Sequence, residues 1–213
     1  MKRIPQTWLF VILIFLLPFT AYALVAWYQQ RFTALPIYGV EAIDKDGNKT
    51  AHHISNFKFI NQDNKIITEK NWNGKIVIAD FFFTRCPSVC LKMTKSLKKV
   101  QEAFANDALI YITSFTVDPE NDSAAQLKHY AKRFNIDNTN WQLLTGDKKE
   151  IYKLARNDFM VVATDGDGGE TDFIHSDKLV LIDKQKRIRG YYDGTDEKEV
   201  TQLIKDIKKL RLF

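Results

Sequence analysis

The sequence KIVIADFFFTRCPSVC, residues 75–90, joins a nearly continuous apolar run to two cysteines, which are the only cysteines of the chain. The apolar run ends at Phe83 and is rich in β-branched and aromatic residues, as is typical of a central strand that is buried on both faces. Beyond the cysteines, apolar residues recur at helical spacing, at Met93, Leu97, Val100 and Phe104. The pattern predicts a strand that leads into a helix, with Cys86 and Cys90 extending the apolar face of that helix.

The segments around this unit alternate between strand and helix patterns. An irregular lead-in over residues 38–49 carries a tight turn at Asp46-Gly47-Asn48, and a hairpin precedes the central strand, over residues 57–60 and 65–68. After the cysteine helix we expect a strand, a helix, a strand, a short helix, a hairpin and an amphipathic helix, at residues 109–115, 123–134, 141–144, 148–156, 178–192 and around 200–210. This order predicts an α/β sandwich with parallel strand pairs.

Composition narrows the class of protein. The chain has 213 residues, 45% of them hydrophobic, which is enough for one well-packed domain and an accessory segment. Its net charge of +5 is spread among interleaved acidic and basic residues, so the sequence does not predict nucleic-acid binding. The acidic loop at residues 164–171 lacks the full calcium-binding pattern and is predicted to be a solvated turn. No boundary divides residues 36–213.

The N-terminal segment predicts export. Residues 8–28 form an apolar run of the length that crosses a bilayer, after two basic residues and with aromatic residues at both ends. We expect residues 1–7 in the cytoplasm, a membrane anchor at 8–28 and a linker at 29–35. Ala21-Tyr22-Ala23 also fits the cleavage site of a signal peptide. Under either reading the domain is exported, and the default location is the periplasmic face of a bacterial inner membrane, with a single membrane pass.

The spacing of the cysteines fits either redox chemistry or metal binding. Pro87 at the first helical position would make Cys86 the N-cap residue and place Cys90 one turn into the helix. Side chains four apart in a helix have Cβ atoms about 5–6 Å apart, whereas a disulfide needs roughly 3.5–4.5 Å. A disulfide therefore requires Cys86 to move at the helix edge. Two thiolates one turn apart can instead hold one soft ion such as Cu(I). The spacing differs from the two-residue gap of thioredoxin-type motifs, which favours a metal.

A metal site needs a further ligand, and His175 is the best candidate. It lies between the predicted loop and the strand that begins at Lys178, where it could approach the cysteines. On spacing alone, such a histidine is more often an ordinary surface or core residue. The other candidates are weaker because of their predicted positions or packing: His52, His53, His129 and Met93.

Several segments together resemble the SCO/SenC family of copper-binding proteins that assemble cytochrome oxidase. The matching segments are FTRCPSVC (83–90), TVDPEND (116–122) with LKHY (127–130), WQLLTG (141–146), and HS (175–176) followed by LID (181–183). The resemblance covers most of residues 56–195. It implies a thioredoxin-like fold with a central mixed sheet. It also implies a copper ion, as Cu(I) or Cu(II), bound by Cys86, Cys90 and His175, with Asp118 near the site.

The resemblance implies a membrane-anchored metallochaperone. Such a protein receives copper from a donor protein and delivers it to the copper-binding subunit of cytochrome c oxidase. The alternative is a thiol-disulfide oxidoreductase, in which Cys86 and Cys90 keep the copper-ligand cysteines of a partner reduced. The chain departs from the usual family pattern at Leu91, where a second proline is common, and at Ser88, which replaces an acidic residue. Neither departure removes a predicted ligand.

Overall fold

The computed structural model describes residues 14–25, 34–40, 42–43, 49–162 and 176–212. The chain divides into two compact units, Met1–Ala34 and Leu35–Phe213. In the first unit, residues 14–25 are helical and expose apolar side chains, including Phe15 and Phe19. The predicted anchor at residues 8–28 extends beyond these described residues at both ends.

Among the described residues, no helix combines the length and the apolar character that a membrane crossing requires.

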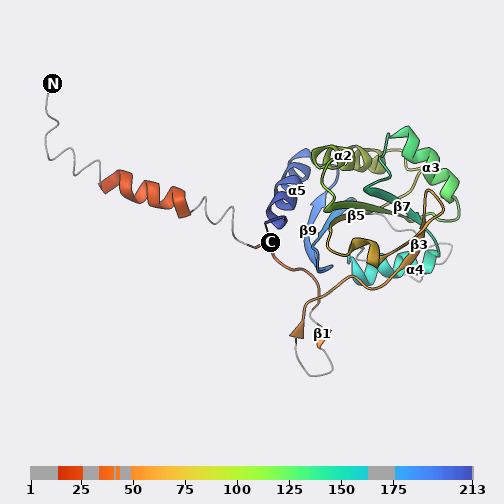
Figure 1. The fold of residues 1–213 in the computed structure, drawn as a ribbon, viewed down its shortest axis with the longest axis horizontal. Helices are drawn as coiled ribbons and strands as arrows, with labels where there is room; N and C mark the ends of the chain where they lie inside the picture. Colours follow the sequence, from red (N-terminus) through yellow and green to blue (C-terminus); the bar gives the residue numbers. More distant parts are fainter. Residues whose placement is uncertain (1–13, 26–33, 41, 44–48, 163–175, 213) are drawn as a thin grey trace. The chain divides into compact units, whose positions relative to one another are not determined.

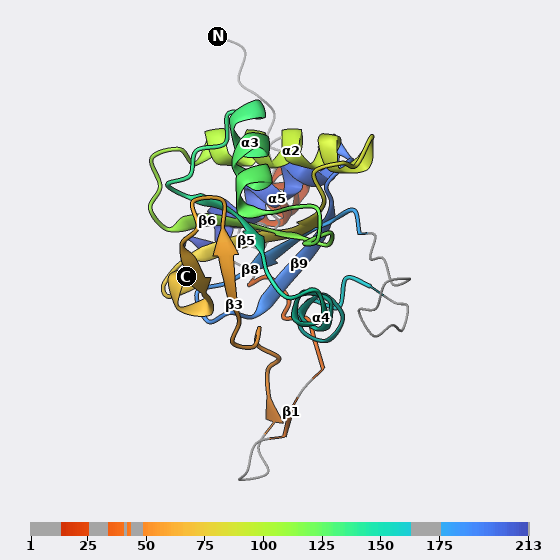
Figure 2. The ribbon, with the colours of Figure 1, turned by 90° about the vertical axis from the view of Figure 1, so that its right-hand side faces the viewer.

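The second unit is built on one seven-stranded mixed sheet (Figures 1 and 2). The three central neighbours β7, β6 and β5 run parallel, and the outer strands pair antiparallel. The predicted α/β fold with a central mixed sheet is therefore confirmed. In spatial order the strands are β4 (Ile66–Thr68), β3 (Lys58–Asn61), β7 (Trp141–Thr145), β6 (Ile110–Thr116), β5 (Ile76–Phe82), β8 (Lys178–Ile182) and β9 (Ile188–Asp193).

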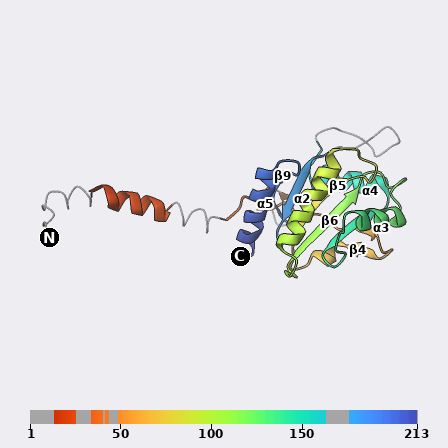
Figure 3. The same ribbon diagram turned by 90° about the horizontal axis from the view of Figure 1, so that it is seen from above.

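Helices cover both faces of this sheet. One face packs against three helices, α2 (Val89–Ala103), α3 (Ala124–Arg133) and α5 (Glu197–Leu210). Seen from above, α2 and α5 lie side by side over the sheet (Figure 3). The other face packs against the short helix η1 (Glu69–Trp72) and α4 (Lys148–Lys153). The chain continues from α4 as a π-helical turn over Leu154–Asp158, in which the Phe159 N–H donates to the Leu154 carbonyl at 2.9 Å.

Strand β5 divides the core into two clusters. All seven of its residues are buried. Alternate side chains enter opposite clusters, because successive side chains of a strand point to opposite faces: Ile76, Ile78 and Phe82 pack with α2, and Val77, Ala79 and Phe81 pack with the α4 side. The expected strand buried on both faces and the expected apolar face of α2 are both confirmed.

The segment before β3 differs from the prediction. The sequence predicted an irregular lead-in, but β1 (Ala42–Ile43) and β2 (Lys49–Thr50) pair antiparallel within it. Strands of two residues are too short for apolar and polar residues to alternate visibly, which explains the miss. The predicted turn at Asp46-Gly47-Asn48 and the predicted acidic loop at 164–171 lie outside the described residues.

Polar side chains on β6 serve two buried tryptophans. The Trp72 indole N–H donates to Thr113 Oγ1 at 3.1 Å on one face. The Trp141 indole N–H donates to Ser114 Oγ at 2.9 Å on the other. An indole N–H that is buried needs such an acceptor. The two hydroxyls therefore allow large aromatic side chains to fill both sides of the sheet.

Asp80 is the exception in β5, because its carboxyl group lies in the core. Its register partner on β6 is Ser114, and its Oδ1 atom has no hydrogen-bond partner among the described residues. Burial raises the pKa of Asp80 to about 7, although a hydrogen bond to Ser114 acts in the opposite direction. A carboxyl group that stays protonated in the fold binds a proton that the unfolded chain has already released.

We therefore expect stability to fall as pH rises from about 4, where the unfolded carboxyl group titrates, to about 7, where the folded one does. Asp80→Asn removes this dependence, and should exceed the wild type in stability by on the order of 4 kcal/mol above pH 7. Urea unfolding of both proteins at pH 4.5, 6 and 8 measures the difference in their free energies of unfolding. A difference that does not change with pH would contradict a raised pKa for Asp80.

Candidate functional site

Both cysteines lie at the junction between the end of β5 and the start of α2. The Cys86 N–H donates to the Phe83 carbonyl at 3.3 Å, which closes a turn before the helix begins. The N-cap residue is Ser88, and Cys90 is the second residue of α2. The prediction of Cys86 as N-cap and Pro87 as first helical residue was wrong, because Cys86 ends this turn and Pro87 lies in a bend, so that the helix begins only at Val89.

The sulfur of Cys86 nevertheless caps the helix. The Cys90 N–H donates to Cys86 Sγ at 3.3 Å, whereas the Ser88 side chain forms no capping hydrogen bond. Both cysteines are reduced, and they are 9% and 5% exposed. The N–H groups in the first turn of a helix have no acceptor within the helix, and here the N–H of Cys90 finds one in the sulfur of Cys86.

The two thiols differ in acidity. Burial acts to raise the pKa of Cys86, but hydrogen bonds from Cys90 and from the backbone of Ser88 and Val89 outweigh it and leave the pKa below that of an ordinary thiol. Burial raises the pKa of Cys90 to about 12, with further contributions from the hydrogen bond to Cys86 and the charge of Asp80. Cys86 is therefore the more easily deprotonated of the two sulfurs, and the thiolate is the form that binds metals and attacks disulfides.

The cysteines line a cavity of about 510 Å³ at this edge of the domain. Much of its wall is apolar, and its lining comes from four separate parts of the chain: Phe81, Phe83, Cys86, Pro87, Ser88, Val89, Cys90, Val117, Val161, Ser176, Asp177 and Lys178. The sulfurs are therefore reached from a recess rather than from a flat surface.

His175 lies outside the described residues, but the two residues after it can be located. Ser176 and Asp177 line the same cavity as the cysteines. Within the described ranges, no group of three or more His, Cys, Asp or Glu side chains could hold a metal ion.

The weaker candidate ligands lie elsewhere or serve other purposes. The His52 ring bonds the Asp158 carbonyl at 2.7 Å, and His129 is exposed on α3. Met93 is fully buried in the core, as its position on the apolar face of α2 predicted. None of these three residues lines the cavity of the cysteines.

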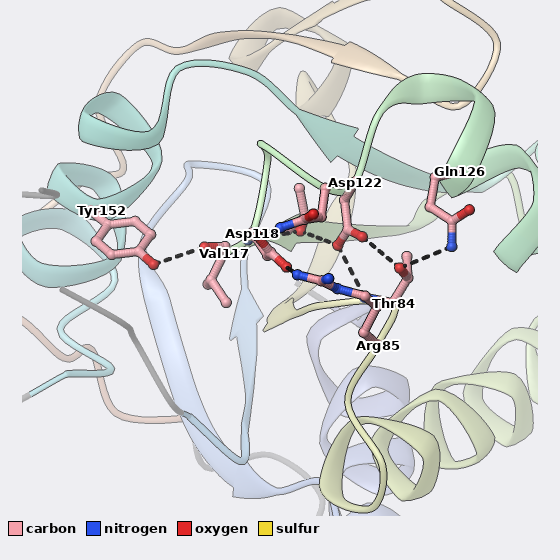
Figure 4. Close-up of polar contacts among 9 residues, drawn as sticks. Thr84, Arg85, Val117, Asp118, Asp122, Gln126 and Tyr152 are labelled. Carbon is pink, nitrogen blue, oxygen red and sulfur yellow. Dashed lines mark hydrogen bonds and ion pairs between the residues drawn. The ribbon is translucent and has the colours of Figure 1, made fainter. Parts of the chain in front are cut away.

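The loop between β6 and α3 supports the residues just before Cys86 (Figure 4). Arg85 Nη2 lies 2.9 Å from Asp118 Oδ2, so the predicted Asp118 contacts the neighbour of Cys86 through an ion pair. The next acid along, Asp122, accepts hydrogen bonds from the backbone and the hydroxyl of Thr84. The same loop is also held from α4, where the Tyr152 hydroxyl donates to the Val117 carbonyl at 2.8 Å.

Sequence reasoning assigned no role to Thr84, Arg85 or Asp122. Thr84 and Arg85 adjoin the cysteines, and Asp122 belongs to a quoted segment, yet their spacing alone does not show that the two loops meet. The parallel pairing of β5 with β6 was the available signal, since parallel neighbours end at the same edge of a sheet.

Comparison with known proteins agrees with this geometry. The family model described as SCO1/SenC matches residues 45–211. The SCO1 protein homolog of Bacillus subtilis is 31% identical over 159 residues, which cover 74% of this chain and 82% of that protein.

Two solved structures extend the comparison. BsSco, described as a member of the Sco family of cytochrome c oxidase assembly proteins with a disulfide switch, has a TM-score of 0.64, 30% identity, and coverage of 75% of this chain and 93% of that one. Bradyrhizobium japonicum ScoI, solved with copper bound, has a TM-score of 0.60, 26% identity, and coverage of 75% and 99%. The extent of the family match, together with a reduced cysteine pair at the end of β5, shows that this chain belongs to the SCO1/SenC family.

Proposed function

We propose that this protein is a copper chaperone that binds one copper ion through Cys86, Cys90 and His175. It receives the ion from a donor protein and passes it to the copper-binding subunit of cytochrome c oxidase. The observation that carries the proposal is the shared cavity, since both cysteines line it together with Ser176 and Asp177, the residues that follow His175. The copper-bound structure of Bradyrhizobium japonicum ScoI supports it.

The donor set suits copper as a cargo. Thiolate sulfur is a soft ligand that favours Cu(I), and imidazole accepts either Cu(I) or Cu(II). The lowered pKa of Cys86 increases the fraction of this sulfur that is present as the thiolate, the form that binds a metal ion. The recess keeps the sulfurs from bulk solvent, yet a partner segment can enter it and exchange ligands. Asp118 would act near this site through Arg85, which it already holds.

We expect reduced wild-type protein to take up one copper ion per chain. His175→Ala should weaken copper binding by at least about a hundredfold, since even the loss of a group that only orients a metal ligand costs 10–100-fold. It should leave the reduction potential of the cysteine pair nearly unchanged. Copper titration with absorption and spin-resonance detection measures the first effect, and a glutathione redox titration the second.

The matched control is His129→Ala, because His129 is an exposed histidine on α3. That variant should bind copper as the wild type does. If reduced wild-type protein takes up no copper, the chaperone proposal fails.

A second function, thiol-disulfide exchange with a partner, is favoured by the unequal acidity of the two cysteines. Cys86 is the thiolate-prone sulfur, and Cys90 is a buried thiol whose pKa is about 12. This arrangement fits attack by Cys86 on a partner disulfide, followed by release when Cys90 attacks the mixed disulfide. The disulfide switch identified in BsSco supports the reading.

In this second function, Cys86→Ser should abolish reduction of a disulfide-bonded peptide that carries two cysteine copper ligands. Cys90→Ser should instead accumulate the mixed disulfide, which mass spectrometry detects as an adduct of the peptide mass. Unchanged peptide reduction by Cys86→Ser would exclude the oxidoreductase role.

We further propose that residues 8–28 anchor the domain to a bacterial inner membrane, with the domain in the periplasm. The apolar side chains exposed on the helix at residues 14–25 support this, since such surface is favourable in lipid and costly in water. The alternative is a signal peptide that is removed after export.

Expressed with its N-terminal segment, the protein should stay in the membrane pellet after an alkaline carbonate wash, whereas a chain that starts at residue 29 should be recovered in the soluble fraction. Sequencing of the mature N-terminus separates the anchor from a cleaved signal. Recovery of the full chain in the soluble fraction with residues 1–28 still attached would contradict the anchor.

A further inference from the structure

A carboxylate that contributes nothing to the cavity wall holds the cysteine loop in place. Asp122 lies between β6 and α3 and is 0% exposed. Among the described residues its carboxylate accepts three hydrogen bonds: Thr84 N to Oδ2 at 3.0 Å, Thr84 Oγ1 to Oδ1 at 2.5 Å, and Thr116 Oγ1 to Oδ2 at 2.5 Å. Two of the three bonds therefore reach the residue that stands two positions before Cys86 (Figure 4).

The neighbouring bonds show which way the hydroxyl protons point. Gln126 Nε2 donates to Thr84 Oγ1 at 3.2 Å, and the Asp118 N–H donates to Thr116 Oγ1 at 3.1 Å. Each hydroxyl has a single proton, and its acceptor side is already used, so the proton is directed at Asp122. A group that accepts three hydrogen bonds and donates none matches an ionised carboxylate, whose bonds are shorter and stronger than those of a neutral group.

The hydrogen bonds of Asp122 lie just beyond the end of the β5–β6 ladder, where they fix the loop that carries Cys86. The Val117 N–H donates to the Phe82 carbonyl at 2.8 Å, and the ladder between β5 and β6 ends there. Beyond this point, Asp122 links the two loops in place of backbone pairing. Thr84 is held by Asp122, and the Cys86 N–H is held by the Phe83 carbonyl, so the chain that carries Cys86 is fixed on both sides of Arg85.

We propose that Asp122 is a positioning residue for Cys86, which keeps the sulfur at the N-terminus of α2 and prevents it from closing onto Cys90. A metal ion can be held by two sulfurs that remain apart, whereas a disulfide requires them to bond. The carboxylate therefore favours the open dithiol that accepts a metal. The inference rests on the proposed function for its copper readout, and the disulfide readout is independent of copper.

The test uses substitutions at both ends of the Asp122–Thr84 contact. Asp122→Asn removes the charge, and Thr84→Val removes the hydroxyl with little change in shape. Thr84→Ser keeps the hydroxyl and removes only the methyl group. Asp206→Asn is the control, since Asp206 is a buried acid on α5 that accepts from the Tyr192 hydroxyl at 2.9 Å and does not line the cavity.

The first measurement equilibrates each protein with glutathione. Two thiols of the protein transfer two electrons and two protons to one glutathione disulfide, which becomes two molecules of glutathione, and the protein gains one disulfide. Thr84→Val and Asp122→Asn should shift this equilibrium toward the protein disulfide by at least about fivefold, or roughly 1 kcal/mol. Thr84→Ser and Asp206→Asn should stay within about twofold of the wild type.

The second measurement is a Cu(I) titration of the same proteins in reduced form. Asp122→Asn and Thr84→Val should bind copper about tenfold more weakly, in the range seen when a metal ligand loses its orienting partner. If Asp122→Asn does not fold, as thermal unfolding would show, the pair Thr84→Val and Thr84→Ser decides the question.

The outcomes separate this inference from the proposed function. If wild-type protein binds no copper but Thr84→Val shifts the glutathione equilibrium, the copper proposal fails and the positioning role stands. If Thr84→Val and Thr84→Ser both match the wild type in the glutathione equilibrium, the positioning role is overturned, whether or not the protein binds copper.

Discussion

The location of both sulfurs depends on the burial of strand β5 on its two faces. Parallel β6 lies on one side of this strand and antiparallel β8 on the other, and its side chains enter two separate apolar clusters. A slip of one residue would exchange the contents of the two clusters, so the register is strongly specified. The register also fixes the point, after Phe82, at which the chain leaves the sheet. Cys86 follows four residues later and therefore lies at the wall of the cavity.

Three acids near the end of this strand show how the surroundings of a carboxyl group determine its use. Asp80 faces the core, where one of its oxygens has no partner in the described part of the chain, and burial keeps a proton on it up to about pH 7. Asp118 is paired with Arg85, whose side chain is 62% exposed. Asp122 is enclosed by hydroxyl and backbone donors. Only Asp118 is linked to a group that an incoming partner could also contact, which makes the Arg85 side chain the accessible part of this network.

The sequence patterns predicted the sheet and its helices well, because hydrophobic periodicity reports burial directly. The nearly continuous apolar run of β5 and the apolar face of α2 are examples, since both follow from side chains that must leave water. Contacts between loops were not predictable in this way. The bond between Thr84 and Asp122 joins residues 38 apart, and it depends on where two strands end rather than on any local pattern. The start of α2 was predicted two residues too early for a related reason, because the turn at residues 83–86 and the bend at Pro87 and Ser88 that follows it come from the way the chain leaves the sheet and not from a local helix signal.

The hydrogen bond from the Cys90 N–H to Cys86 Sγ caps helix α2, and the strength of this cap depends on the oxidation state of the two cysteines. A thiolate is a good acceptor for this N–H group, whereas the sulfur of a disulfide is a weak one. Oxidation of the pair therefore leaves the first turn of α2 without its cap, since Ser88 does not supply one. The backbone N–H groups of Ser88, Val89 and Cys90, which bond to the sulfur of reduced Cys86, then lose a good acceptor at the wall of the recess. A protein that docks there would therefore meet unsatisfied N–H donors on the oxidised molecule and a sulfur that already holds them on the reduced one.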